Sequence, residues 1–171
     1  VEEIITPSPL RVEPPCPYFG RCGGCDFQQP AYEAQLTAKA EMIRDCLHRI
    51  ARLENVPEIV VTPSPDVWRY RMRATWQIDR EQRTIGYYER GSRRVCDVAD
   101  CAVLQPGLQE KLERVRATEW QQFPEELKHL DVVAGEHGVS FAPEFAEFET
   151  SELSLTVGGE VYRYNAQTFF Q

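Results

Sequence analysis

The 171-residue sequence lacks several features that mark common functional classes. No apolar run approaches the ~20 residues that a membrane-spanning helix needs. No G-x-G-x-x-G motif follows a predicted strand, so no glycine-rich cofactor site is visible. The histidines are few and show no metal-ligand spacing. We expect surface or helix-capping roles for His48, His129 and His137. The sequence therefore predicts no catalytic residue within this chain and no membrane partner.

The charge balance argues against a generic nucleic-acid-binding protein, but the charge is unevenly distributed. The formal net charge is −8, with 27% charged and 42% hydrophobic residues, as in a globular domain. Residues 68–94 hold eight arginines against three acidic residues, a net charge of +5, which leaves −13 for the rest. This asymmetry is more informative than the total.

Three of the six cysteines lie in one glycine-rich stretch, Cys16-Pro-Tyr-Phe-Gly-Arg-Cys22-Gly-Gly-Cys25. Glycine permits the sharp bending that is needed to aim three sulfurs at one point. A CxxC pair is too local to cross-link a fold of this size, and no signal-peptide pattern is present. In an intracellular protein such a pair more often binds metal or does redox chemistry. We therefore predict a cytoplasmic protein with a metal site that needs a fourth ligand.

The fourth ligand is one of the remaining cysteines. Cys46 lies in a strongly helical segment, where a thiol usually acts as a small apolar residue. Cys96 and Cys101 share a turn-like run, and we favour Cys101 because an apolar strand-like piece and then Pro106 follow it. Structural zinc sites usually use two short knuckles, whereas three ligands on one loop with a remote fourth favour an iron–sulfur cluster. Spacing alone leaves zinc open.

Hydrophobic periodicity predicts an α+β domain with a mostly antiparallel sheet, two helices and the cysteine loop. The segment at 30–53 has one apolar stripe at three- and four-residue steps, which predicts core packing. Gly158-Gly159 predicts a tight hairpin turn. The predicted helices are 30–53 and 106–123, and the predicted strands are 58–62, 68–78, 84–89, 130–134, 139–142, 153–157 and 161–164.

The strand predicted at 68–78 alternates between apolar and arginine-rich faces, with Tyr70 expected on the buried side. An exposed arginine row suits successive phosphates of an RNA, which it would position without reading bases. Nearby aromatic residues, Tyr87 among them, offer stacking faces for unpaired bases. The alternative is a solvated face that forms salt bridges, with the aromatic residues in the core. The predicted RNA contacts are Arg71, Arg73, Arg93 and Arg94.

Five motifs in this order resemble the class I S-adenosylmethionine-dependent RNA uracil-5-methyltransferases, which make 5-methyluridine in rRNA or tRNA. The first is the cysteine loop. The others are Tyr32 with Gln35-Leu36-x-x-Lys39, Tyr70-Arg71-x-Arg73, Cys101-x-Val103-Leu104-x-Pro106 and Phe169-Phe170-Gln171.

The resemblance implies a cofactor set and a ligand set. It implies a [4Fe–4S] cluster, as in the rRNA-modifying members, and S-adenosylmethionine bound by a domain outside this chain. It makes RNA the partner, with rRNA favoured over tRNA, and places Phe169 and Gln171 at the edge of the substrate pocket. The implied cluster ligands are Cys16, Cys22, Cys25 and Cys101.

The resemblance also implies a domain plan. Residues 1–30 and 58–168 form the iron–sulfur and RNA-contacting central domain, and 169–171 begin the methyltransferase domain. The helix at 31–57 packs on that domain, so in the isolated chain its 31–53 part exposes apolar surface and supports non-physiological self-association. We expect the chain alone to be inactive. The alternative reading is a stand-alone zinc or iron–sulfur redox or interaction module.

Overall fold

The computed structural model describes residues 4–169. They divide into two compact units. Unit 1 comprises Val1–Pro17 and Cys25–Val67, and unit 2 comprises Tyr18–Gly24 and Trp68–Gln171. None of the helices in the described range is long and apolar enough to cross a membrane.

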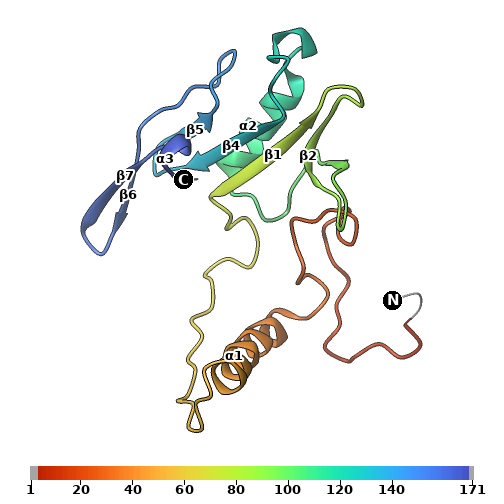
Figure 1. Ribbon diagram of the computed structural model, residues 1–171, viewed down its shortest axis with the longest axis vertical. Helices are drawn as coiled ribbons and strands as arrows, with labels where there is room; N and C mark the ends of the chain where they lie inside the picture. The colour runs from red at the N-terminus through yellow and green to blue at the C-terminus, as the bar shows by residue number, and fades with distance from the viewer. Residues whose placement is uncertain (1–3, 170–171) are drawn as a thin grey trace. The chain divides into compact units, whose positions relative to one another are not determined.

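Unit 1 contains one regular element among its described residues, helix α1 (Tyr32–Arg49), drawn in orange in Figure 1. The predicted helix is confirmed, with both ends shorter than expected. The predicted core packing of its stripe is wrong, because no α1 residue is buried and Ile43 is 48% exposed. The Ser64 amide donates to the Tyr32 hydroxyl at 2.7 Å and ties the following segment to the helix.

The predicted strand at 58–62 is absent from the structure. The segment has no hydrogen-bonded strand partner, and Val60 is 83% exposed. β-branched residues favour an extended backbone, but a strand also needs a neighbour to satisfy its amides and carbonyls. Local propensity alone therefore gave a false strand.

Unit 2 is built on a five-stranded antiparallel sheet with the order β3-β2-β1-β4-β5 (Figure 1). The α+β class with a mostly antiparallel sheet is confirmed. Strand β3 was not predicted, because its three residues lie within a run that reads as a turn. The strands are β1 (Arg73–Asp79), β2 (Thr84–Tyr88), β3 (Val95–Asp97), β4 (His129–Ala134) and β5 (Val139–Ala142).

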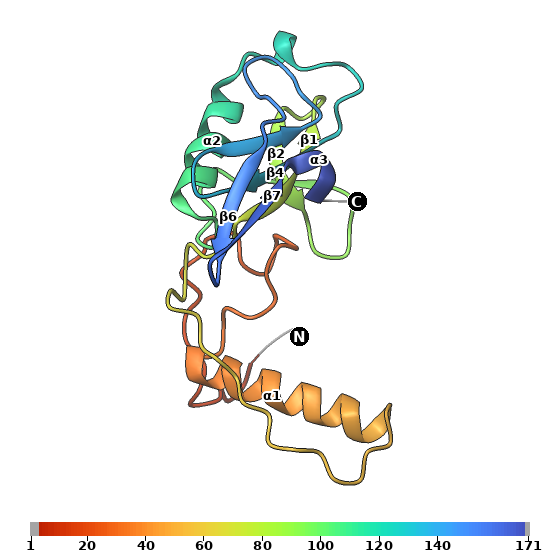
Figure 2. The same cartoon turned by 90° about the vertical axis from the view of Figure 1, so that its left-hand side faces the viewer.

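Helix α2 (Pro106–Ala117) covers one face of this sheet, and the four-residue helix α3 (Ala166–Phe169) lies on the other (Figure 2). Leu108, Leu112 and Val115 form the inner edge of α2 and are fully buried. The helix ends at Ala117 rather than at 123, where Thr118 turns extended and the 3-10 turn η1 (Trp120–Gln122) follows. With α3, the structure has three α-helices in its described part, not two.

Strands β6 (Leu153–Val157) and β7 (Glu160–Tyr164) form a separate hairpin. Its turn is the predicted Gly158-Gly159 pair, with φ of 60° and 89°, values that a two-residue hairpin turn requires. The Tyr164 hydroxyl donates to the Ala134 carbonyl at 2.7 Å and holds the base of the hairpin on the main sheet.

Candidate metal centre and arginine surface

The part of the cysteine loop that belongs to unit 2 is bonded to the end of β2. The Gly23 amide donates to the Tyr88 carbonyl at 2.9 Å, and the Arg90 amide donates to the Arg21 carbonyl at 2.8 Å. A Cβ at Gly23 would lie 2.9 Å from that Tyr88 carbonyl oxygen, so only glycine allows this approach. The loop thus pairs with the chain just past β2, where Cys22 and Glu89 form an antiparallel bridge.

Cys22 and Arg71 both form hydrogen bonds with the backbone of Gly24. The Gly24 amide donates to Cys22 Sγ at 3.4 Å, and Arg71 Nη2 donates to the Gly24 carbonyl at 2.9 Å. A Cβ at Gly24 would lie 3.4 Å from Cys22 Sγ and 3.6 Å from Arg71 Nη1. The Arg71 guanidinium therefore fixes the backbone of the loop that carries Cys22.

The sequence predicted that the segment around Arg71 belongs to the strand at 68–78. Instead this segment lies outside β1 and pairs with the segment that follows Cys101. The Arg71 amide donates to the Val103 carbonyl at 2.7 Å, and the Gln105 amide donates to the Arg71 carbonyl at 3.0 Å. Tyr70, expected in the core, is 52% exposed. The pairing brings the backbone of the arginine motif beside the Cys101 segment.

Cys101 is buried, and a glutamine of α2 fixes its backbone. The Cys101 amide donates to Gln109 Oε1 at 3.0 Å, and Gln109 Nε2 donates to the Ala99 carbonyl at 2.9 Å. Gln109 is 8% exposed and also donates to Glu113 at 3.0 Å. Gln109 was not predicted from the sequence. The available signal was its position in the first turn of a helix, on the apolar edge beside Leu108 and Leu112.

The four predicted ligands are divided between the two units. Cys16 and Cys25 belong to unit 1, and Cys22 and Cys101 belong to unit 2. Within residues 4–169, no three histidine, cysteine, aspartate or glutamate side chains lie together as a metal-ligand group. The [4Fe–4S] ligand set stays a prediction.

The chemical type of the four predicted side chains suits such a cluster. Four thiols are its usual donor set. The Gly24 amide that donates to the Cys22 sulfur suits a ligand that carries negative charge, and the Arg71 guanidinium that binds the Gly24 carbonyl adds a positive charge to the same loop.

The cysteines that were not chosen differ from each other in burial. Cys96 lies in β3 opposite Tyr87 and is 1% exposed, whereas Cys46 is exposed on α1. The prediction that Cys46 packs as a small apolar residue is therefore wrong. The preference for Cys101 over Cys96 stays a prediction.

The predicted RNA-contacting arginines have different surroundings. Arg73 lies with its guanidinium 5.2 Å from the centre of the Phe169 ring, and Arg94 pairs with Glu89 at 2.7 Å. Arg93 is exposed. Tyr87, considered as a stacking face for bases, is buried in the sheet and cannot serve as one, whereas Tyr88 is 44% exposed. The RNA contacts stay a prediction.

Phe169, at the end of α3, is 39% exposed. Gln171, the other predicted pocket residue, lies outside the described residues. The pocket role of both therefore stays a prediction.

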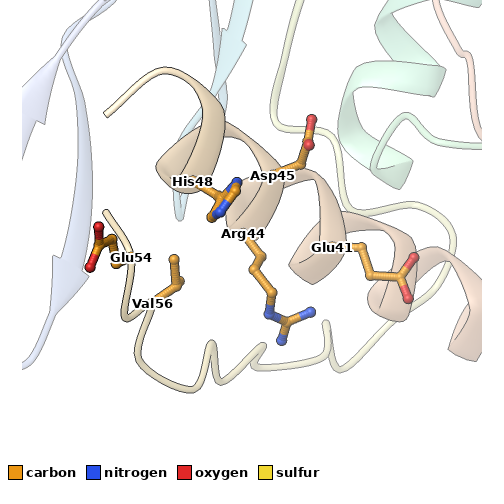
Figure 3. Close-up of a pocket in the computed structure, with 6 residues that line it drawn as sticks. All are labelled: Glu41, Arg44, Asp45, His48, Glu54 and Val56. Carbon is orange, nitrogen blue, oxygen red and sulfur yellow. The ribbon is translucent and has the colours of Figure 1, made fainter. Parts of the chain in front are cut away.

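Two hollows have no cysteine in their lining. One, of about 480 Å³ in unit 1, is lined by charged residues of α1 and the segment after it (Figure 3). Its lining is Glu41, Arg44, Asp45, His48, Glu54 and Val56. The other, of about 610 Å³, lies in unit 2 beside His129, Asp131 and Gln167. Neither was predicted from the sequence.

Relatives of known type place the chain in a family. No family model matches it. It is 36% identical over 140 residues to the 23S rRNA (uracil(1939)-C(5))-methyltransferase RlmD of Dechloromonas aromatica, covering 78% of this chain and 32% of that protein. It is 32% identical over 139 residues to the protein of the same name from Vibrio parahaemolyticus, covering 80% and 32%. The chain therefore spans about a third of the length of these relatives.

A solved structure shows the same fold. The tRNA (uracil-54, C5)-methyltransferase of Pyrococcus abyssi, solved with S-adenosyl-L-homocysteine, superposes with a TM-score of 0.59 at 21% identity. The match covers 92% of this chain and 40% of that one. The relatives, whose names describe uracil-C5 methylation of RNA, identify the chain as a member of the RNA uracil-5-methyltransferase family.

Proposed function

We propose that this chain is the iron–sulfur central region of an S-adenosylmethionine-dependent RNA uracil-5-methyltransferase, and that it positions RNA for methylation at carbon 5. The relatives named for 23S rRNA favour rRNA over tRNA as the substrate. In this proposal the protein acts in the cytoplasm. The observation that supports the proposal most is the arrangement around Gly24, whose amide donates to the Cys22 sulfur and whose carbonyl accepts from the Arg71 guanidinium.

In this proposal Cys16, Cys22, Cys25 and Cys101 hold a [4Fe–4S] cluster. The group, when bound, supplies a covalent cross-link between the cysteine loop and the Cys101 segment, and uracil methylation needs no electron transfer from it. Gln109 fixes the backbone of Cys101, and Arg71 fixes the loop at Gly24. These contacts hold two of the ligands in unit 2.

Anaerobic reconstitution with iron and sulfide tests the cluster. We expect a brown protein whose broad visible absorption is bleached by dithionite. Cys101→Ser should abolish it, while Cys96→Ser, a change at a second buried cysteine of the same unit, should retain it. A colourless protein that binds zinc instead would support the stand-alone zinc module. Equal loss in both variants would refute the choice of Cys101.

RNA contact is proposed for Arg71, Arg73, Arg93 and Arg94. Because Arg71 also bonds the loop, the test uses the double variant Arg73→Ala/Arg93→Ala, measured against a structured rRNA fragment at several salt concentrations. Each lost phosphate contact should reduce the slope of log K against log salt by about 0.7–0.9. Arg163→Ala, which removes an exposed pairing with Glu152 in the separate hairpin, is the matched control. Equal slopes in both variants would remove these arginines from the interface.

We further propose that residues from 169 onwards begin the methyltransferase domain, which binds S-adenosylmethionine, with Phe169 and Gln171 at the edge of its substrate pocket. The relatives are about two and a half times as long as this chain, since the 140 aligned residues make up 32% of the Dechloromonas aromatica protein. The 171-residue chain should therefore transfer no methyl group from labelled S-adenosylmethionine to rRNA, whereas a chain extended to the length of the relatives should. Transfer by the short chain at the rate of the long one would refute this.

The exposed stripe of α1 is proposed to pack on that domain, and residues 1–30 and 58–168 to form the central domain. Ile43 is 48% exposed and Ile50 is 75% exposed, an apolar surface that is costly to leave in water. The isolated chain should therefore self-associate weakly. Sedimentation should show a dimer that Ile43→Glu abolishes and the polar change Lys39→Gln retains. A monomer in all three samples would contradict this part.

A further inference from the structure

The hollow in unit 2 lies on the face of the sheet that carries α3, opposite α2 (Figure 2). Its lining comes from β4, from the end of β5 and the chain after it, and from the start of α3. Its volume of about 610 Å³ is within the range of roughly 300–1,000 Å³ that is usual for ligand sites. Small apolar residues, Ala142 and Ala166, lie among the polar side chains of His129, Asp131, Glu144, Thr150 and Gln167. A few polar groups beside an apolar surface are typical of a binding site.

Two carboxylates determine what this hollow can bind. Asp131 Oδ1 accepts a hydrogen bond from the Thr75 hydroxyl at 2.6 Å, and Glu144 Oε1 accepts one from the Thr150 amide at 3.0 Å. These bonds fix both side chains, and since a carboxylate offers about four acceptor sites, each can still accept from a ligand. Among the described residues, the lining includes no lysine or arginine. The hollow therefore suits a group that carries N–H donors and disfavours a phosphate.

A cation lies at the other end of α3. The Arg73 guanidinium is 5.2 Å from the ring centre of Phe169, the last residue of α3, whereas Ala166 and Gln167, its first two residues, line the hollow. Three residues of helix advance by only about 4.5 Å. Arg73 also precedes Thr75 by two residues on β1, so both side chains project from the same face of the sheet. A proposed phosphate contact and a hollow that favours N–H donors are thus neighbours, as are the backbone and the base of a nucleotide.

We propose that this hollow receives an unpaired base of the RNA that carries an exocyclic amino group, and that Asp131 and Glu144 accept hydrogen bonds from that base. The inference rests on the proposed RNA contact of Arg73. Cytosine presents an amino donor where uracil presents a carbonyl oxygen, which a carboxylate repels. The base bound here is therefore not the uracil that is methylated. The arginines position the phosphates, and the hollow selects the sequence beside them.

Asp131→Asn tests the inference, because a base contact and simple charge repulsion predict effects of opposite sign. Removing a negative charge near an RNA strengthens binding if Asp131 touches no base. If Asp131 accepts from a base, the variant loses a charge-assisted hydrogen bond, so its affinity for oligo(C) should fall about tenfold. Its affinity for oligo(U) of the same length should stay equal or rise. Fluorescence anisotropy with the two labelled RNAs measures both affinities, and the wild-type chain should bind oligo(C) more tightly than oligo(U).

Glu149→Gln is the matched control, since Glu149 is an exposed acid of the same loop that does not line the hollow. It removes the same charge and should raise the affinity for both RNAs slightly and equally. The inference is wrong if Asp131→Asn behaves like Glu149→Gln, if it weakens binding of both RNAs equally, or if the wild type does not distinguish them. If Arg73→Ala weakens binding of neither RNA, the proposed RNA contact fails instead, a result that is distinguishable from these.

Discussion

Gln109 offers the sharpest test of how α2 holds the segment that carries Cys101. The proposed change is Gln109→Leu, which has a similar volume but can neither accept the Cys101 amide nor donate to the Ala99 carbonyl. No predicted site included this residue. Its three hydrogen bonds nevertheless connect the helix, the Cys101 segment and Glu113.

The expected cost follows from the burial of each partner. The Cys101 amide is buried, so leaving it without an acceptor costs about 1–3 kcal/mol. Ala99 is exposed, so water replaces Gln109 at its carbonyl and the loss there is about 0.5–1 kcal/mol. Gln109→Leu should therefore lower the free energy of unfolding by about 2–4 kcal/mol. Gln109→Glu keeps the acceptor but meets Glu113 four residues on, so it should cost only about 1 kcal/mol.

Urea unfolding of the metal-free chain measures these differences, and reconstitution shows whether the cluster is retained. The matched control is Glu110→Ala, an exposed position on the same turn of α2, which should change stability by less than about 0.5 kcal/mol. If Gln109→Leu costs no more than Glu110→Ala, the Cys101 amide is satisfied in some other way. The positioning role of Gln109 would then be wrong.

Two further predictions concern the sheet. Gly86→Ala should lower the free energy of unfolding in urea by at least about 3 kcal/mol, because the new Cβ would lie 2.1 Å from the Cys96 carbonyl oxygen. The control Gly107→Ala meets only a side-chain atom at 3.8 Å and should stabilise α2 by about 0.5–1 kcal/mol. A mild effect at Gly86 would mean that β2 and β3 separate easily. Asp97→Asn should cost about 1 kcal/mol at pH 7, since the hydrogen-bonded Arg116 guanidinium holds the pKa of Asp97 below its ordinary value. A carboxyl group whose pKa is lower in the folded state stabilises the fold at pH values above its unfolded-state pKa, and this stabilisation is lost as the pH falls through its folded-state pKa. The difference in unfolding free energy between wild type and Asp97→Asn should therefore vanish in strong acid. A difference that stays constant from pH 7 to 2 would exclude a charge effect.

The regular elements of unit 2 could largely be predicted because their patterns are periodic and their partners are close in sequence. Ala74, Trp76 and Ile78 alternate on one face of β1 as expected, and the stripe of α2 is buried. β3 was missed because three residues carry too little pattern. Its place is fixed by pairing with β2, which no local signal shows.

The errors in unit 1 have a different cause. The stripe of α1 and the β-branched run at 58–62 are both strong local patterns, but patterns predict burial only where a second element is available to cover them. Among its described residues unit 1 contains no such element. At the candidate site, the cysteines and arginines were recognisable from spacing. Gln109 was not, since its importance depends on which polar atoms it approaches in the folded chain.

The division of the chain into two units has a practical consequence for dissecting it. Residues 18–24 belong to unit 2, but the segments on both sides of them belong to unit 1. The backbone therefore passes from one unit to the other at three places, and no single truncation point yields either unit as an unbroken polypeptide. Deleting 1–67 to isolate the sheet would also remove Gly23 and its hydrogen bond to Tyr88, so the shortened protein would expose an edge of β2 that the intact chain covers.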